Sequence, residues 1–95
     1  MDYPKFPVVD AKAIGARIHY LRKKNHFRVD DISEFMGFGT PQAVYKWQRG
    51  DSIPTVDNLL ALSSLFGTTV DYILKGDDKE EADQASSLIL SVISL

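Results

Sequence analysis

Three polar side chains near the middle of the chain, Gln42, Tyr45 and Lys46, have the chemistry needed to recognise nucleic acid. They occupy early, exposed positions of a short predicted helix, while Val44 and Trp47 fall on its opposite side. A glutamine amide can make two hydrogen bonds to an adenine edge, and a lysine can bind either a base or a phosphate. This spacing therefore predicts a helix that can present base-reading side chains to DNA.

The predicted helix over residues 41–48 follows another short helix over 29–36, and glycines separate the two. Two short helices joined by such a turn indicate a helix-turn-helix unit. In that unit the second helix enters the major groove, and its N-terminal residues meet the base edges. Trp47 and Val44 would hold this helix to the core.

The elements that position these residues are all predicted to be helical. Apolar residues at spacings of three and four, such as Ile14, Ile18 and Leu21, mark one face of a helix. The expected helices cover residues 11–25, 29–36, 41–48, 56–66 and 70–75. The expected N-caps are Asp10, Thr40, Thr55 and Thr69, and the expected stops are Gly37, Gly50, Gly67 and Gly76. Five short helices predict an all-α bundle.

Three parts are expected along the chain. Pro4 and Pro7 favour an extended N-terminal arm over residues 1–9. Residues 10–76 would form the helix-turn-helix DNA-binding domain. Residues 77–95 are predicted as an additional C-terminal helix, although 88–95 could also form a strand. The apolar positions of this tail recur at spacings of three and four, and they are Ala82, Ala85, Leu88, Ile89, Val92 and Leu95.

Charge is unevenly distributed. The chain has 95 residues, with 11 basic and 13 acidic ones, and the net charge of -2 excludes a histone-like nucleic-acid binder. Residues 77–83 contain five of the acids, so the tail sets this balance. Residues 11–29 contain no acid and can give one face a positive potential. The basic residues of that run are Lys12, Arg17, Arg22, Lys23, Lys24 and Arg28.

Other functions find little support. The absence of cysteine excludes disulfides, thiolate zinc sites and cysteine nucleophiles. His19 and His26 are too few for a convincing metal site, and no serine has a partner pattern for catalysis. No apolar run reaches the roughly 20 residues of a membrane helix, and no signal segment is evident. We therefore expect a cytoplasmic protein that is not an enzyme and has no metal or cofactor.

The order and length of these helices resemble the Cro and phage-repressor type of helix-turn-helix, also called the xenobiotic-response-element family. The residues that carry the resemblance lie at 14–24, Ile32, Gly37, 44–50, Pro54, 59–62, 65–67 and 70–74. The resemblance implies a five-helix lambda-repressor-like DNA-binding domain. Such domains usually bind palindromic operators as dimers, so a double-stranded DNA operator and a homodimer are the implied partners.

The resemblance also implies roles for individual residues. Gln42 and Lys46 would read bases, with Pro41, Ala43 and Tyr45 close to them. Thr40, at the start of this helix, would face a phosphate or a base. From the residues themselves, Arg49 beside Gly50, together with Arg28 and Lys24 of the basic run, are further expected contacts with the DNA backbone.

The chain departs from the family pattern at several positions near the expected DNA contacts. Arg28 and Val29 stand where the family usually has threonine and glutamine, so Arg28 would supply the phosphate contact of that glutamine. Gln48 replaces a glutamate that usually pairs with the arginine at position 22, and a hydrogen bond is expected instead. Asp51 stands where basic residues often meet the backbone. These departures predict a modest phosphate affinity.

Two functions remain open at this point. The first is a sequence-specific DNA-binding transcriptional regulator, a repressor, that uses the helix 41–48. The alternative is an antitoxin or protein-interaction module on the same fold, because fold alone does not decide function. The apolar positions in 82–95 would suit either dimerisation or another protein partner.

Overall fold

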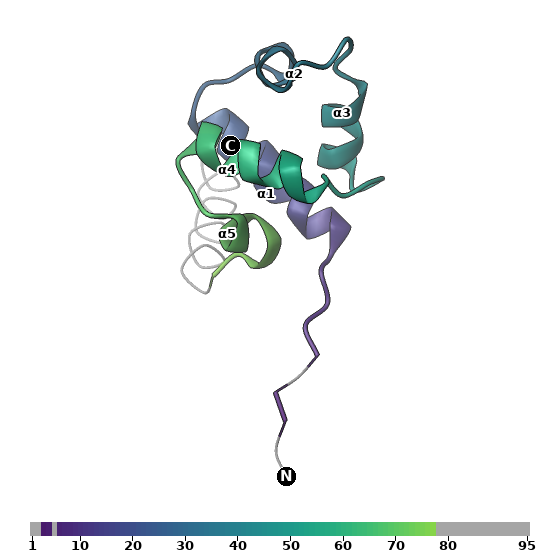
Figure 1. The fold of residues 1–95 in the computed structure, drawn as a ribbon, viewed down its shortest axis with the longest axis vertical. Helices are drawn as coiled ribbons and strands as arrows, with labels where there is room; N and C mark the ends of the chain where they lie inside the picture. Colours follow the sequence, from purple (N-terminus) through teal and green to yellow (C-terminus); the bar gives the residue numbers. More distant parts are fainter. Residues whose placement is uncertain (1–2, 5, 78–95) are drawn as a thin grey trace, which may run out of the picture.

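The computed structural model describes residues 3–4 and 6–77, and everything below refers to those residues. They form five helices, and the predicted all-α class is confirmed (Figure 1). The helices are α1 (Ala11–Lys24), α2 (Val29–Met36), α3 (Gln42–Arg49), α4 (Val56–Phe66) and α5 (Val70–Lys75). The C-terminal helix expected within 77–95 lies outside the described residues, apart from Asp77.

Three predicted N-caps are confirmed by hydrogen bonds to the first turn of their helices. The Asp10 carboxylate accepts from the backbone N–H of Lys12 at 3.0 Å, which opens α1. The Thr55 hydroxyl accepts from the Asn58 N–H at 3.3 Å. The Thr69 hydroxyl accepts from an N–H of α5 at 3.0 Å. Each bond satisfies a backbone donor that the helix itself leaves unpaired, so local sequence is enough to start these helices.

The predicted start of the third helix is wrong by one residue. Pro41, rather than Thr40, occupies the N-cap of α3, and the helix runs to Arg49 rather than to residue 48. The Thr40 carbonyl accepts a hydrogen bond of 2.9 Å from the buried Ser33 hydroxyl of α2. That contact joins the backbone of residue 40 to α2, and the hydrogen bond that opens α3 runs from the Tyr45 N–H to the Pro41 carbonyl. Thr40 is therefore a connecting residue between the two helices.

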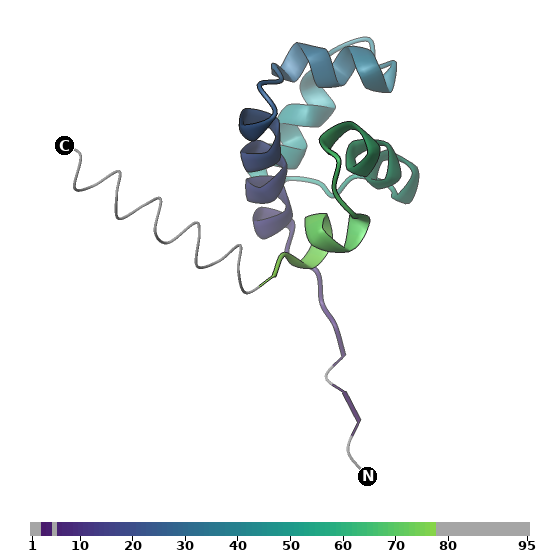
Figure 2. The same cartoon turned by 90° about the vertical axis from the view of Figure 1, so that its left-hand side faces the viewer.

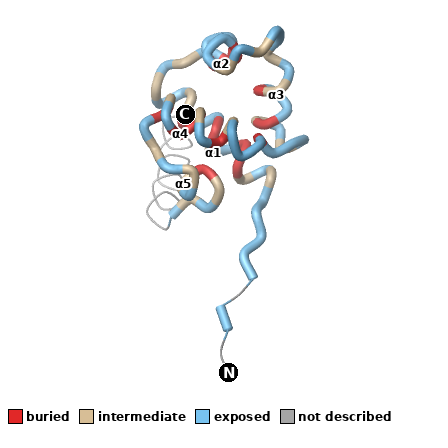
Figure 3. Tube along the Cα trace, viewed as in Figure 1, coloured by how far each residue is buried: buried red, intermediate tan, exposed pale blue. Residues whose placement is uncertain are grey.

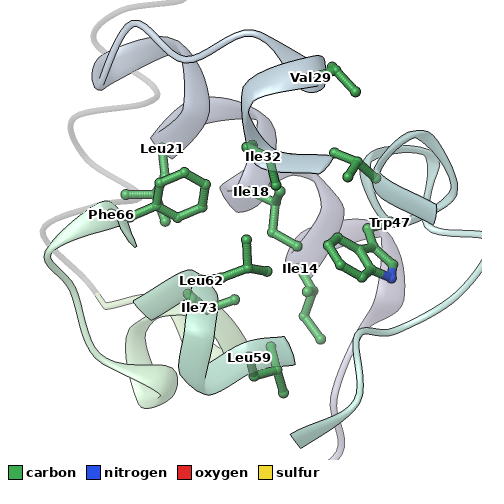
Figure 4. Packing of buried hydrophobic residues seen from close by; sticks show 11 residues of the cluster. Ile14, Ile18, Leu21, Val29, Ile32, Trp47, Leu59, Leu62, Phe66 and Ile73 are labelled. Atoms are coloured by element: carbon green, nitrogen blue, oxygen red, sulfur yellow. The ribbon is translucent and has the colours of Figure 1, made fainter. Parts of the chain in front are cut away.

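The buried residues come from all five helices (Figure 3), and their side chains meet in one core (Figure 4). The members that are almost inaccessible to solvent are Ile14, Ile18, Ile32, Val44, Leu62 and Ile73. The prediction that Trp47 belongs to this core is confirmed, because only 4% of it is exposed. Its ring meets Phe38 edge-on, with centroids 5.8 Å apart. The α2–α3 turn is therefore tied to the core through this aromatic pair.

Two glycines allow the end of α3 to lie directly on α1. A Cβ on Gly15 would collide with the backbone carbonyl oxygen of Trp47. A Cβ on Gly50 would come within 2.9 Å of the Lys12 Cα, and Gly50 also has a positive φ of 79°. A side chain at either position would push the two helices apart. The orientation of α3 is therefore fixed by α1 as well as by α2.

Candidate nucleic-acid interface

The exposed side of α3 gathers four side chains that can donate hydrogen bonds or carry positive charge. Gln42, Tyr45, Lys46 and Arg49 line an open concavity of about 230 Å³. Their spacing of three and four residues places them on one face of the helix, while Val44 and Trp47 are buried on the other. The structure thus brings together three predicted base contacts and one predicted backbone contact on a single helical surface.

Hydrogen bonds from α1 hold the far end of this helix. The Arg22 Nε donates to the Gln48 Oε1 at 3.0 Å, and the Arg22 Nη1 donates to the Phe27 carbonyl at 3.0 Å. The His19 Nδ1 lies 3.2 Å from the same glutamine oxygen. The predicted Arg22–Gln48 hydrogen bond is therefore confirmed. Arg22 joins α3 to the α1–α2 turn, which fixes the spacing of the helix-turn-helix unit.

A second concavity, of about 340 Å³, lies next to the first. Tyr45 borders both concavities, so they are adjacent. The other lining residues are Arg22, Arg28, Val29 and Asp30. Two arginines and the N-terminal end of α2 give this hollow the positive character that suits a phosphate, although Asp30 opposes it. Arg22 was expected to belong to the basic face of residues 11–29 and to pair with Gln48, but not to contact DNA itself, and its place in this hollow adds it to the candidate contacts.

Arg28 and Val29, at the start of α2, differ in how well their side chains can contact a ligand. The Arg28 N–H donates to the Asp31 carboxylate at 2.7 Å, and this bond fixes the backbone at the start of α2. The Arg28 side chain remains exposed and free to reach a ligand. Val29 is buried and has no polar atom in its side chain. Arg28 is therefore better placed than Val29 to meet a phosphate at this end of α2.

Arg49 already has an acidic partner at the edge of α3. Its Nε lies 2.8 Å from the Asp51 Oδ2, and each side chain is more than half exposed. An exposed ion pair of this kind is weak, typically below about 1 kcal/mol. A phosphate could therefore replace Asp51, but Asp51 would lower the attraction of this edge for DNA.

The remaining candidates surround these two hollows without lining them. Pro41 and Ala43 are half-buried at the start of α3, and Thr40 is exposed just before it. Lys24 is exposed at the end of α1, where its ammonium lies 6.0 Å from the centre of the Tyr20 ring. Of the four predicted backbone contacts, Arg28 and Arg49 therefore line a concavity, whereas Thr40 and Lys24 do not.

The chain is similar to known helix-turn-helix proteins. The helix-turn-helix family model matches residues 18–73. The chain is 35% identical over 69 residues to the repressor protein C2 of Salmonella phage P22. It is also 35% identical over 68 residues to the HTH-type transcriptional regulator DicA of Escherichia coli. These alignments cover 73% and 72% of this chain, but only 32% of the phage protein and 50% of DicA.

A solved structure shows the same fold. The crystal structure of the P22 c2 repressor in complex with a synthetic operator superposes with a TM-score of 0.63 at 38% identity. The match covers 67% of this chain and 96% of that chain. The predicted lambda-repressor-like domain is thereby confirmed. Within the described residues, no helix is long and apolar enough to cross a membrane.

Proposed function

The chain belongs to the helix-turn-helix family, and from this premise we propose that it is a sequence-specific DNA-binding transcriptional repressor that reads the major groove with α3. The observation that carries this proposal is the exposed face of α3, where Gln42, Tyr45, Lys46 and Arg49 line one open concavity. The P22 c2 repressor, which shares the fold, is bound to operator DNA in its crystal structure. Both facts support an α3 that enters the major groove of DNA with these side chains facing the bases.

Base recognition falls to the first part of α3. Gln42 is exposed one residue after the N-cap, where its amide can bond both the N6 and the N7 of an adenine. Lys46 lies one turn further along and can donate to a guanine edge or to a phosphate. Pro41, Ala43 and Tyr45 offer apolar surface beside them, which suits a thymine methyl group. The core contacts of Trp47 keep this face in a constant position.

Phosphates on either side of the groove would be held by the surrounding basic residues. Arg28 and Arg22 line the hollow beside α2, and this hollow borders the reading face through Tyr45. Arg49 lies at the other edge of α3. Thr40 and Lys24 are proposed as further contacts with the DNA backbone. Contacts of this kind position the protein on the duplex without reading its sequence.

A single α3 meets only a few base pairs, so we propose that the protein acts as a homodimer on two half-sites. Such a role would be carried out in the cytoplasm on a double-stranded operator. The segment 82–95, which lies outside the described residues, has apolar residues at helical spacing and is proposed to add a protein contact.

That same segment supports a second candidate function. A tail that is acidic at its start and apolar further on suits a binding surface for another protein, as in an antitoxin. The chain would then use its helix-turn-helix domain to bring that partner to DNA, or would bind the partner alone.

Selection of duplexes from random DNA separates these functions. A DNA-binding repressor should enrich a sequence with two related half-sites, and purified protein should bind that sequence at least 1,000-fold, or about 4 kcal/mol, more tightly than unrelated DNA. Recovery of no common sequence after repeated rounds would argue for the protein-binding alternative.

A further inference from the structure

An apolar surface at the start of α4 contains none of the residues that line the two concavities of the proposed DNA face. Val56 and Leu60 are one helical turn apart and are 79% and 64% exposed. Ile53, in the connector just before α4, is 40% exposed. We refer to these three residues as the α4 stripe. The opposite side of α4 buries Leu59 and Leu62 in the core, whereas no residue of the stripe belongs to that core.

A second exposed apolar set lies in the arm, residues 3–9 before α1, of which Lys5 is not described. Tyr3, Phe6, Val8 and Val9 are all exposed, and Phe6 reaches 88%. Pro4 and Pro7 fix their own φ angles and bias the residues before them towards extended backbone. The arm runs away from the helices in both views (Figures 1 and 2). Its apolar side chains therefore find no cover on their own domain.

Both sets begin at the same end of the domain. Gly50, which leads into the connector that carries Ile53, lies against Lys12 in the first turn of α1. The arm joins α1 only two residues before Lys12, at Asp10. Asp10, where the arm joins α1, and Gly50, which leads into the connector before α4, thus lie close together in space. In the sequence, 40 residues separate Asp10 from Gly50.

The arm is nevertheless poorly suited to cover the stripe of its own chain. A return onto α4 would need a tight reversal near its root, within residues 8–10. Asp10 is extended, with φ -115° and ψ 110°, and its carboxylate is held by the N-cap hydrogen bonds. The residues before it are Val8 and Val9, and no glycine occurs between Tyr3 and Asp10. β-Branched residues without glycine favour continued extension over a turn.

We propose that two copies of this chain exchange arms, so that the arm of each copy covers the α4 stripe of the other. An isologous pair about a twofold axis near this shared end would bury both apolar sets twice. The occupant is a second copy because the chain itself supplies a matching apolar segment that leaves the domain from beside the stripe. Gln42, Tyr45, Lys46 and Arg49 belong to neither set, so the exchange itself uses none of the side chains on the proposed DNA face.

Cross-linking can test the exchange directly because the chain has no cysteine of its own. The full-length variants Phe6→Cys and Leu60→Cys, carrying tags of different size, are mixed and oxidised without DNA. We expect a disulfide-linked pair containing one of each chain, at least tenfold more abundant than in the control. The control mixes Phe6→Cys with Phe35→Cys, because Phe35 is 51% exposed on α2 and belongs to neither set.

Two results of this experiment would overturn the proposal. One is a yield of linked chains equal to that of the Phe35→Cys control. The other comes from the double variant with cysteine at both positions 6 and 60. If it links only within one chain, the arm covers the stripe of its own copy.

Sedimentation of the full chain supplies a test that needs no cross-link. The pair Val56→Ser with Leu60→Ser, and the pair Phe6→Ser with Val8→Ser, should each raise the dimer dissociation constant at least tenfold. Phe35→Ser should leave it unchanged, and circular dichroism checks that each variant keeps its helices. Loss of association in the stripe variant alone would mean that the stripes pair with each other and that no arm is exchanged. No DNA is present, so either outcome leaves the proposed repressor function to be judged separately.

Discussion

At the scale of single residues, the proposed phosphate contacts can be separated from base contacts by their dependence on salt. We expect Arg28→Ala and Arg49→Ala each to weaken binding to every DNA sequence. Each should also lower the slope of log affinity against log salt by roughly 1, because one fewer counterion is released. Titrations at several salt concentrations measure this slope. Lys75→Ala is the matched control, because Lys75 is exposed on α5 and lines neither concavity, and an equal effect there would remove the assigned role.

Removal of the Asp51 charge should have the opposite effect and raise the affinity for DNA. Its carboxylate holds the Arg49 guanidinium at 2.8 Å and adds a negative charge at the edge of α3. Asp51→Asn should therefore raise the affinity for all DNA sequences by a similar factor, and more at low salt than at high salt. The same substitution combined with Arg49→Ala should give a smaller gain. Unchanged or weaker binding by Asp51→Asn would show that the ion pair does not compete with DNA.

At the scale of elements, the sequence predicts most of the fold because most of its signals are local. Asp10, Thr55 and Thr69 cap their helices through contacts two or three residues away, and α2 has the predicted bounds. The start of α3 could not be obtained in this way. Thr40, the expected cap, instead accepts a hydrogen bond through its carbonyl from Ser33 of α2. A tertiary contact of this kind leaves no periodic pattern in the sequence.

The candidate site was predictable to a similar degree. The exposure of Gln42, Tyr45 and Lys46 follows from helical spacing and was correctly expected. The position of Arg22 beside Arg28 could not be predicted, because it depends on how the end of α1 approaches α2. The ion pair of Arg49 with Asp51 depends on side-chain rotamers, which residue types alone do not determine.

Trp47 links the reading face to the core, and its loss should be costly. Trp47→Ala removes a side chain that is 4% exposed and packed edge-on against Phe38. A cost of about 3–5 kcal/mol in the free energy of unfolding is expected for such a cavity. Urea unfolding followed by circular dichroism measures it, since the tryptophan signal itself is lost. An unfolding midpoint close to that of the wild-type chain would contradict the buried position of Trp47.

At the scale of the whole molecule, the described core is confined to α1–α5, whereas the proposed tail contact lies beyond Gly76. A chain that ends at Gly76 should therefore keep its helices and unfold cooperatively. It should also form weaker dimers and bind operator less tightly, because the contact from 82–95 is gone. Light scattering and circular dichroism of both chains test this. Equal association of the two chains would exclude the tail from assembly, and loss of folding would show that it completes the domain.

The measurement that tests the central claim most directly is the affinity of Gln42→Ala for two duplexes. One is the sequence selected by the wild-type protein, and the other is the same length of unrelated DNA. If α3 reads bases through Gln42, the variant should lose about 1–3 kcal/mol on the selected sequence and little on the unrelated one. Equal losses on both duplexes, or no loss on either, would contradict the account of α3 as the reading helix.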